Sequence, residues 1–446
     1  MFQNIPLSEL NFLDEYEISS LPIHLYKNIS GKNNGVPFDI YNYDFLFNDE
    51  ETIRIIRNGL TIGCVYIESP GMRSLLKKLD VTTFEMLTAA SSIIRPGVAE
   101  SGMMQEFIAR HKDPSKRKYL LPQMETVLAE TYGVMVYQED VIKVAHHVAG
   151  LTLDEADVLR RAMSGKMRSH HAMQLIVNRF FESCDKKKIS RKVSNELWRQ
   201  IESFAGYSFC KAHSASFALL SFQVAYLKAH FSAEFMACVL NNRGGFYSSA
   251  VYIQEAKRLG IKILLPCINK SENEYKGSDK QILIGLMAIK YLSNSSIKNI
   301  LMQREKYGKY VSLADFIIRT KLGIKEIQLL IKSGAMDCFA ETRHTLLRLA
   351  DVYFNRFKIL DEGYNDLFIN ESFELENTVK TNIDLSIEEK CIAEYESFDY
   401  MVTKHPLEFF TEWNEKLSLV SSNQMQKHAG KRVKMIGWYM SSKRIK

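Results

Sequence analysis

FAGYSFCKAHSASFALLSFQVAYLKAHFSAEFM, residues 204–236, is the stretch that decides the fold class of this chain. From about Ser214 onward its apolar residues recur at intervals of three and four, which predicts a long amphipathic helix. The same spacing, punctuated by glycines, recurs at 122–133, 137–150 and 221–240. The sequence therefore predicts a mainly α protein, with helices throughout residues 66–245.

Composition limits the classes of function. The chain has 446 residues, of which 46% are hydrophobic and 25% charged, as in an ordinary globular protein of about two to four domains. Its net charge of +6 is only mildly basic, so a nucleic-acid argument depends on where the cations cluster. The seven cysteines are scattered without a CxxC pair, which predicts reduced thiols in a cytoplasmic protein and no zinc site. No apolar run is long enough to span a bilayer, so no membrane association is expected.

The composition and periodicity of the sequence change outside the helical region. Residues 1–60 mix short apolar patches with acidic residues, Asn and Gly, and NISGKNNGVPFDIYNYD at 28–44 predicts a loop and short strands. Short helices are expected again over 284–350, and the acidic, poorly periodic residues 360–400 are expected to form a linker or loose helices. The last segment, KRVKMIGWYMSSKRIK at 431–446, alternates like a strand. Because a single strand does not fold alone, we expect the chain to stop inside its last domain.

Cations gather in RRAMSGKMR, residues 160–168. Guanidinium groups make forked, charge-assisted hydrogen bonds to phosphate oxygens, and a lysine adds a point charge. We predict that Arg160, Arg161 and Lys166 converge on a polyphosphate, because Gly165 interrupts the helix and lets the chain turn back. The alternative is a cationic helix face that is merely solvated.

Two further segments carry candidate ligand-binding residues. In TYGVMVYQEDVIKVAHH, 131–147, Tyr137 and Gln138 stand at the start of a helix, where backbone N–H groups attract phosphate and aromatic rings can stack on bases. The alternative is a helix cap with tyrosines in the core. Lys211 and His213 lie at a turn before the long helix. His213 alone would be interpreted as structural, but the pair points to a ligand.

A third candidate region has the character of a DNA contact. Arg95 begins the rigid turn Arg-Pro-Gly, and the loop RHKDPSKRKY at 110–119 follows it. Lys116, Arg117 and Lys118 in this loop suit the phosphates of a nucleic-acid backbone. The alternative is a solvated basic loop.

The order of these segments and the residues within them resemble the bacterial DNA polymerase III alpha subunit, the family C replicative DNA polymerase. Their sequence pattern resembles the error-prone branch of that family. The resemblance covers residues 60–446 and rests on IESPGMRSLL, RPGVAESGMMQEFIARH, TYGVMVYQEDVIKVA, GLTLDEADVLRRAMSGK, FAGYSFCKAHSASFALLSFQVAYLKAHFSAEFM, KRLGIKILLPCINKS and KSGAMDCF.

The resemblance implies an order of domains. It implies a remnant of the palm and its connection at 1–60, helical nucleotide-binding fingers at 61–270, a helix-hairpin-helix region at 271–350, a linker and clamp-binding region at 351–430, and the first strand of an OB domain at 431–446.

It also implies roles for the candidate residues. The fingers would hold the triphosphate of the incoming deoxynucleotide with Arg160, Arg161 and Lys166. Tyr137 and Gln138 match the motif beside the nascent base pair, and Lys211 and His213 match the motif near the nucleotide sugar and phosphates. Cys210 and Ala212 replace the Asn and Ser of the family beside that last motif. Arg95 and the 116–118 cations would contact DNA.

The sequence departs from the family in its catalytic palm. Family members use Mg²⁺ and deoxynucleoside triphosphates, and two-metal phosphoryl transfer needs clustered carboxylates. No such triad occurs here, and the nearest counterpart of one palm aspartate, in LNFLDEY, is Asn11. Asn lacks the charge that Mg²⁺ needs at that position. We therefore expect no metal ligands or catalytic residues in this chain, and no activity from it alone.

Two other motifs are altered. The segment IGLMAIKYLSNSSIKNI, 284–300, resembles the first helix-hairpin-helix, but Tyr291-Leu292-Ser293 replaces the Gly-apolar-Gly that brings backbone N–H groups to DNA phosphates. Leu367 and Phe368 resemble the end of a clamp-binding motif, with Tyr364 where Gln is expected.

The resemblance therefore predicts a DNA-directed DNA polymerase, a nucleotidyltransferase of replication or repair, of which this portion binds nucleotide and a DNA primer–template. The sliding clamp, other replisome subunits or a separately encoded palm would be its partners. One alternative is a non-catalytic DNA-binding or clamp-binding adaptor, and another is a helical scaffold with solvated cationic faces.

Overall fold

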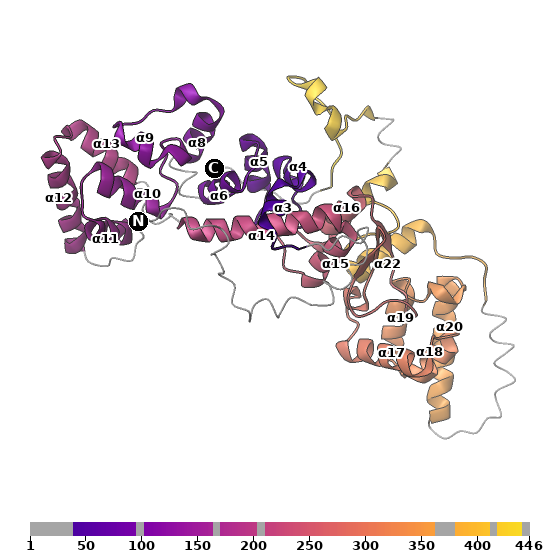
Figure 1. Cartoon of the computed structure of the whole chain (residues 1–446). Helices are drawn as coiled ribbons and strands as arrows, with labels where there is room; N and C mark the ends of the chain where they lie inside the picture. The colour runs from indigo at the N-terminus through magenta and orange to yellow at the C-terminus, as the bar shows by residue number, and fades with distance from the viewer. Residues whose placement is uncertain are drawn as a thin grey trace. The chain divides into compact units, whose positions relative to one another are not determined.

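The computed structural model describes residues 39–94, 102–163, 170–202, 210–361, 380–410 and 417–438. These residues form helices and one small three-stranded sheet (Figure 1), so the predicted mainly α fold is confirmed. Within this described part, no helix combines the length and apolar character required to cross a membrane.

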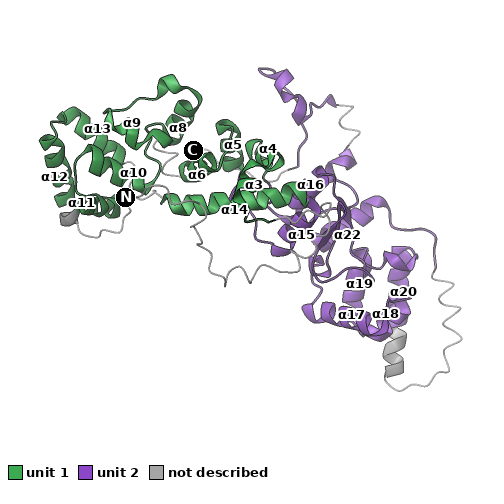
Figure 2. Ribbon diagram, in the orientation of Figure 1, with its two compact units in different colours: residues 1–61, 70–231 green, residues 62–69, 232–446 purple. Residues whose placement is uncertain are grey.

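The chain divides into two compact units (Figure 2). Unit 1 comprises residues 1–61 and 70–231, and unit 2 comprises residues 62–69 and 232–446. Residues 62–69 thus lie in the sequence of unit 1 but pack in unit 2.

Unit 1 contains short helices and one long helix. Its helices are α3 (Tyr43–Asn48), α4 (Glu50–Arg57), α5 (Pro70–Leu79), α6 (Phe84–Ile93), α8 (Met103–Lys112), η2 (Pro114–Lys116), α9 (Gln123–Val127), η3 (Ala129–Thr131), α10 (Gln138–Lys143), the π-helical turn η4 (Val144–Val148), α11 (Leu153–Met163), α12 (His170–Lys186), α13 (Arg191–Glu202) and α14 (Lys211–His230).

Helix α14 is the long helix that the opening stretch predicts, and it begins at Lys211, three residues before the predicted start. It packs against α6, α4 and α3. Polar groups on it are satisfied inside the unit: the Ser214 hydroxyl lies 2.7 Å from that of Ser92, and Lys228 Nζ donates to the Leu60 carbonyl at 2.7 Å. A helix in contact with neighbours on several sides serves as the central support of its unit.

Helices α9 to α13 share a second core in unit 1. Apolar residues from each helix meet there, among them Met124, Val141, Leu159, Phe180 and Leu197. The ring of Phe180 lies 5.3 Å from that of Trp198 on α13. This core fixes the relative position of α10 and α11, whose ends carry the candidate nucleotide ligands.

Unit 2 combines helices with the sheet. Its elements are α15 (Ser232–Asn242), α16 (Ser249–Arg258), β1 (Lys262–Leu264), β2 (Lys276–Ser278), β3 (Gln281–Leu283), η5 (Leu286–Ala288), α17 (Asn294–Tyr307), α18 (Leu313–Thr320), α19 (Ile324–Lys332), η6 (Asp337–Phe339), α20 (Arg343–Asp361), α22 (Ile387–Phe398), η7 (Pro406–Phe410) and η8 (Ser422–His428).

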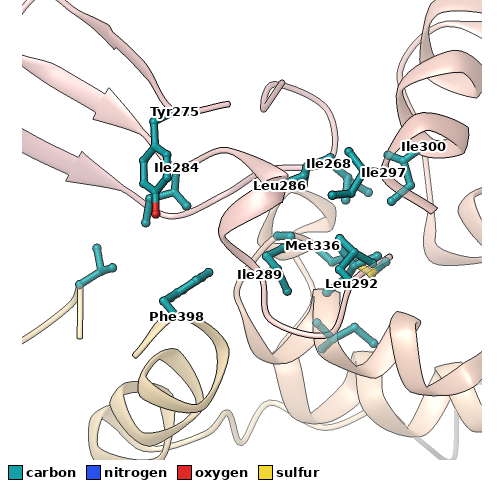
Figure 3. Packing of buried hydrophobic residues seen from close by; sticks show 14 of the residues in the cluster. Ile268, Tyr275, Ile284, Leu286, Ile289, Leu292, Ile297, Ile300, Met336 and Phe398 are labelled. Atoms are coloured by element: carbon teal, nitrogen blue, oxygen red, sulfur yellow. The ribbon is translucent and has the colours of Figure 1, made fainter. Parts of the chain in front are cut away.

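The sheet has the order β1-β3-β2, with β1 parallel and β2 antiparallel to β3. Strand β2 lies directly on α15: a Cβ added at Gly277 would be 2.2 Å from the Ala233 carbonyl oxygen, so only glycine fits. Apolar residues from the sheet and the following helices fill one core, in which Ile268, Ile284, Met336 and Phe398 meet (Figure 3).

The prediction of a loop and short strands at 28–44 is wrong at Tyr43 and Asp44, where α3 begins, and α4 follows at Glu50–Arg57. Both helices have strong local signals. The Asn42 side chain accepts from Phe45 N–H, and Asp49 accepts from Thr52 N–H, as helix N-caps do. EETIRIIR then places Ile55 and Ile56 in the core.

The expected strand at the end of the chain does not form in its described part. Residues 432–438 have no regular secondary structure, and one backbone bond, Val420 N–H to the Lys434 carbonyl at 2.9 Å, ties this segment back. Residues 439–446 lie outside the described residues, so the OB domain stays a prediction.

Candidate functional site

The start of α10 organises the candidate nucleotide site in unit 1. Tyr137 precedes the helix in an extended conformation. The buried carboxylate of Asp140 accepts hydrogen bonds from the N–H groups of Val136 (2.8 Å) and Tyr137 (2.9 Å), closing the helix end as an N-terminal cap does. Asp140, a buried acid, therefore fixes the backbone at Tyr137, immediately before Gln138.

Burial perturbs both ionisable groups at this helix start. Burial raises the pKa of Asp140 to about 6. The hydrogen bonds that its carboxylate accepts from two backbone N–H groups oppose that rise. Burial also raises the pKa of Tyr137, and the nearby carboxylates of Glu130, Asp140 and Glu139 raise it further. The Tyr137 ring is only 2% exposed, so it packs inside the unit and presents no free face to a base.

Arg160 connects α11 to α10. Its Nη1 donates to Gln138 Oε1 at 3.1 Å, and its other nitrogens bind Asp157 on the preceding turn of α11 at 2.8 Å. The side chain is about three-quarters buried, with 24% of its surface exposed. This arginine is therefore oriented by one partner on each helix.

Arg161 shares the same carboxylate. Its Nη2 lies 2.8 Å from Asp157 Oδ2, and its side chain is more exposed than that of Arg160. The hydrogen bond from Arg160 and the charge of Arg161 hold the pKa of Asp157 below its ordinary value. One acid thus keeps both guanidinium groups side by side at the end of α11.

Lys211, the first residue of α14, contacts the start of α10. Its backbone N–H donates to Glu139 Oε2 at 2.9 Å, so an acid from α10 satisfies the first turn of α14. Its ammonium lies 2.5 Å from Glu130 Oε1 and 5.6 Å from the centre of the Tyr137 ring. His213 lies two residues further along, with its ring 4.8 Å from that of Phe217 on the same helix.

The structure therefore gathers Tyr137, Gln138, Arg160 and Lys211 around the first turn of α10, with Arg161 beside Arg160. His213 contacts Phe217 on its own helix, and its role near a ligand stays a prediction. Lys166 and Arg95 lie outside the described residues, and their roles stay predictions.

The acidic partners of these residues did not figure in the sequence prediction. Asp157 stands three and four residues before the two arginines, and this helical spacing signals ion pairs that the sequence could have revealed. No local signal reveals that Glu130 and Glu139 reach Lys211, because these contacts join segments distant in the sequence.

The basic loop folds onto the turn at Tyr132. Arg117 donates to the Arg110 carbonyl, and its guanidinium carbon lies 4.4 Å from the centre of the Tyr132 ring. At Gly133, φ is +79° and an added Cβ would be 2.7 Å from Tyr119, so the turn requires glycine. Lys116 and Lys118 lie on either side of this anchored arginine, and Lys116 is exposed.

The altered hairpin, residues 289–293, uses its amides within unit 2. Lys290 N–H donates to the Ser397 carbonyl (2.9 Å), and Ser293 N–H donates to Glu326 Oε1 (3.3 Å). Tyr291 adopts a left-handed φ of +63°, which glycine reaches more easily. The Glu326 carboxylate at this hairpin repels phosphate, and two of the hairpin amides are already used within unit 2.

The remaining predictions concern residues without a described site. Leu367, Phe368 and Asn11 lie outside the described residues. Within the described ranges, no group of three or more His, Cys, Asp or Glu side chains could hold a metal ion.

Comparison with known families places this arrangement in a class. Residues 22–188 match the family described as the bacterial DNA polymerase III alpha subunit finger domain, and residues 260–346 match a helix-hairpin-helix motif. The unit 1 helices up to α12 thus match a DNA polymerase fingers region, and the segment around α17 to α19 matches a helix-hairpin-helix.

Similar proteins of known name belong to the same class. The DNA polymerase III subunit alpha of Campylobacter jejuni is 35% identical over 404 residues, covering 86% of this chain and 33% of that protein. The Buchnera aphidicola protein of the same name is 34% identical over 418 residues (89% and 36%), and that of Helicobacter pylori is 36% identical over 395 (83% and 32%). The chain belongs to the DNA polymerase III alpha subunit family, as the resemblance predicts, and spans about a third of the length of these relatives.

Proposed function

We propose that this chain acts in DNA replication as the fingers and helix-hairpin-helix portion of a DNA polymerase III alpha subunit, and that the start of α10 binds the incoming deoxynucleoside triphosphate. The observation that carries the proposal is the meeting of Arg160, Gln138 and Lys211, from three different helices, at one helix end.

The electrostatics of this helix end suit a triphosphate. Such a ligand carries about four negative charges and needs several cations held by packed helices. Asp157 orients the two arginines, and Glu130 neutralises Lys211. A triphosphate that replaces Glu130 as the partner of Lys211 would gain a cation without moving a helix.

Replacing Arg160 with Ala should weaken binding of deoxyadenosine triphosphate to the full chain by about 10- to 150-fold. The range corresponds to the loss of a charged hydrogen bond, about 1.5–3 kcal/mol. Isothermal titration calorimetry measures it. Arg199→Ala is the matched control, because Arg199 also pairs with an acid three residues before it, Glu196, but lies on α13.

Glu130→Gln tests the same site in the opposite direction. It removes the negative charge beside Lys211, so the affinity for the triphosphate should rise. Equal affinities for Arg160→Ala, Arg199→Ala and the unsubstituted chain would refute the nucleotide site, and so would a weaker affinity after Glu130→Gln.

The basic loop is proposed to contact the backbone of the primer–template. The double substitution Lys116→Gln and Lys118→Gln should lower the magnitude of the slope of log affinity against log salt by about 0.9 for each phosphate that the loop no longer neutralises. Fluorescence anisotropy with labelled primer–template at several salt concentrations measures this slope. Arg117 is left unchanged because it supports Tyr132.

Lys77→Gln with Lys78→Gln, two exposed lysines in the last turn of α5, provides the control of equal charge. An identical salt slope for both double variants would show that the 116–118 loop is only solvated.

The partners follow from the family. We propose DNA primer–template as the substrate, and a separately encoded palm, the sliding clamp or other replisome subunits as protein partners. The alternative, a non-catalytic DNA-binding adaptor, is favoured by the lack of a carboxylate cluster among the described residues. Nucleotide affinity that depends on Arg160 distinguishes the two, since an adaptor needs DNA contacts alone.

A further inference from the structure

Two cysteines that are far apart in the sequence meet in unit 2. Cys267 follows β1 and Cys338 lies in η6, and the two segments are joined by the backbone hydrogen bond from Ile268 N–H to the Ala335 carbonyl at 2.9 Å. The Asn269 side-chain amide also lies 3.7 Å from Cys338 Sγ. Cys338 is exposed and Cys267 partly exposed, whereas Cys64, Cys184 and Cys391 are buried. This is therefore a solvent-accessible dithiol, which the spacing of the cysteines in the sequence does not reveal.

Hydrogen bonds hold the backbone at Cys267 in place. Cys267 N–H donates to the Ser271 hydroxyl at 3.0 Å, and Ser271 N–H donates back to the Cys267 carbonyl at 2.7 Å. The Ser271 hydroxyl in turn donates to the Ile284 carbonyl at 2.7 Å. This closed turn is fully bonded within unit 2.

The segment that carries Cys338 is held equally firmly. Asp337 binds the guanidinium of buried Arg343 through both carboxylate oxygens, at 2.9 and 2.7 Å. The two segments are joined by the bond from Ile268 N–H to the Ala335 carbonyl at 2.9 Å. Ile268 and Met336 also pack in one apolar cluster (Figure 3). The fold therefore holds the two segments that carry the cysteines side by side.

We propose that Cys267 and Cys338 form a reversible intramolecular disulfide by exchange with a small-molecule disulfide such as glutathione disulfide, which makes this pair a redox-modification site of the helix-hairpin-helix region. The proposal is independent of nucleotide binding, because neither cysteine is in unit 1.

The chemistry balances without a metal. The Cys267 thiolate attacks one sulfur of glutathione disulfide, forms a mixed disulfide and releases one glutathione thiolate, which takes the proton of Cys338. Cys338 then attacks the Cys267 sulfur and displaces the second glutathione. The dithiol loses two electrons and two protons, and one glutathione disulfide becomes two glutathione thiols.

The local environment favours Cys267 as the attacking group. The hydrogen bond with Cys338 lowers the pKa of Cys267, with backbone N–H groups at Asn269 and Lys270 and the charge of Lys270 contributing further. The same interaction raises the pKa of Cys338, which keeps Cys338 protonated while the Cys267 thiolate makes the first attack. The product would close a loop of roughly 70 residues around α17 to α19 and so restrict the unfolded chain.

Peptide mapping of the full chain tests the proposal. After incubation with glutathione disulfide, trypsin should release peptides 263–270 and 333–343 joined by a disulfide, and excess reduced glutathione should separate them again. Cys338→Ser should instead retain one glutathione on Cys267, whereas Cys238→Ser, a partly exposed cysteine of the same unit, should give the same joined peptides as the unsubstituted chain.

Peptide mapping of the unsubstituted chain tests the disulfide even where a variant fails to fold. Absence of the joined peptides under conditions that modify other accessible thiols would overturn the proposal. A stable glutathione adduct on Cys338 with Cys267 still reduced would overturn it as well.

Discussion

Replacing Glu68 with Ala is expected to lower the free energy of unfolding of unit 2 by about 3–5 kcal/mol, because it leaves several buried donors without partners. The Glu68 carboxylate is 4% exposed. It accepts from Gly63 N–H (2.8 Å), Phe246 N–H (2.6 Å) and the Tyr252 hydroxyl (3.0 Å). These bonds connect residues 62–69 to Phe246, between α15 and α16, and to Tyr252 on α16. One side chain therefore holds together two segments that are far apart in the sequence.

Two measurements follow this effect. Guanidinium unfolding monitored by circular dichroism gives the free energy, and hydrogen exchange should show lost protection at 62–69 and around 246–252. Glu68→Gln retains an oxygen acceptor and should cost less. Glu388→Ala, an exposed glutamate on α22, is the control. A Glu68→Ala protein as stable as this control would show that the buried bonds contribute little.

The main helices were predictable because their signals are local. The apolar spacing of α14 identifies it directly, and its start is displaced by three residues because Glu139 from another helix satisfies the Lys211 N–H. Helix α22 falls in a region predicted to be linker or loose helices. Its signal was a capping box, since Ser386 and Glu389 bond reciprocally to each other's backbone. Weak periodicity concealed this helix although its start was marked.

The candidate site was predictable only in part. Residue chemistry and the family resemblance both predict Arg160, Gln138 and Lys211 as ligands, and the structure brings them to one helix end. The interior position of the Tyr137 ring and the pairing of Lys211 with Glu130 depend on tertiary packing, which no local spacing encodes. The closeness of the segments that carry Cys267 and Cys338 has the same origin, since a backbone hydrogen bond joins residues distant in the sequence.

Replacing Asp140 with Ala is expected to lower the free energy of unfolding of unit 1 by about 2–4 kcal/mol, because the buried N–H groups of Val136 and Tyr137 lose their acceptor. The same change should weaken nucleotide binding, since these bonds set the position of Tyr137 and Gln138. Asp140→Asn keeps one oxygen acceptor and should lose less of both. Lys143→Ala, which removes only the distant ion pair with Asp140 at 4.0 Å, is the matched control.

The dependence on pH separates Asp140 from an ordinary capping residue. Its pKa is about 6 in the folded chain, above the value near 3.9 of an unfolded aspartate, so the folded state binds the proton more tightly. The contribution of Asp140 to stability is therefore greatest below about pH 4 and is lost as pH rises through about 6, a change on the order of 2–3 kcal/mol. The destabilisation by Asp140→Ala should consequently be larger at pH 5 than at pH 7. Guanidinium unfolding at the two pH values measures this difference, and a larger loss at pH 7 would mean that the folded fingers bind the ionised carboxylate more favourably than water does.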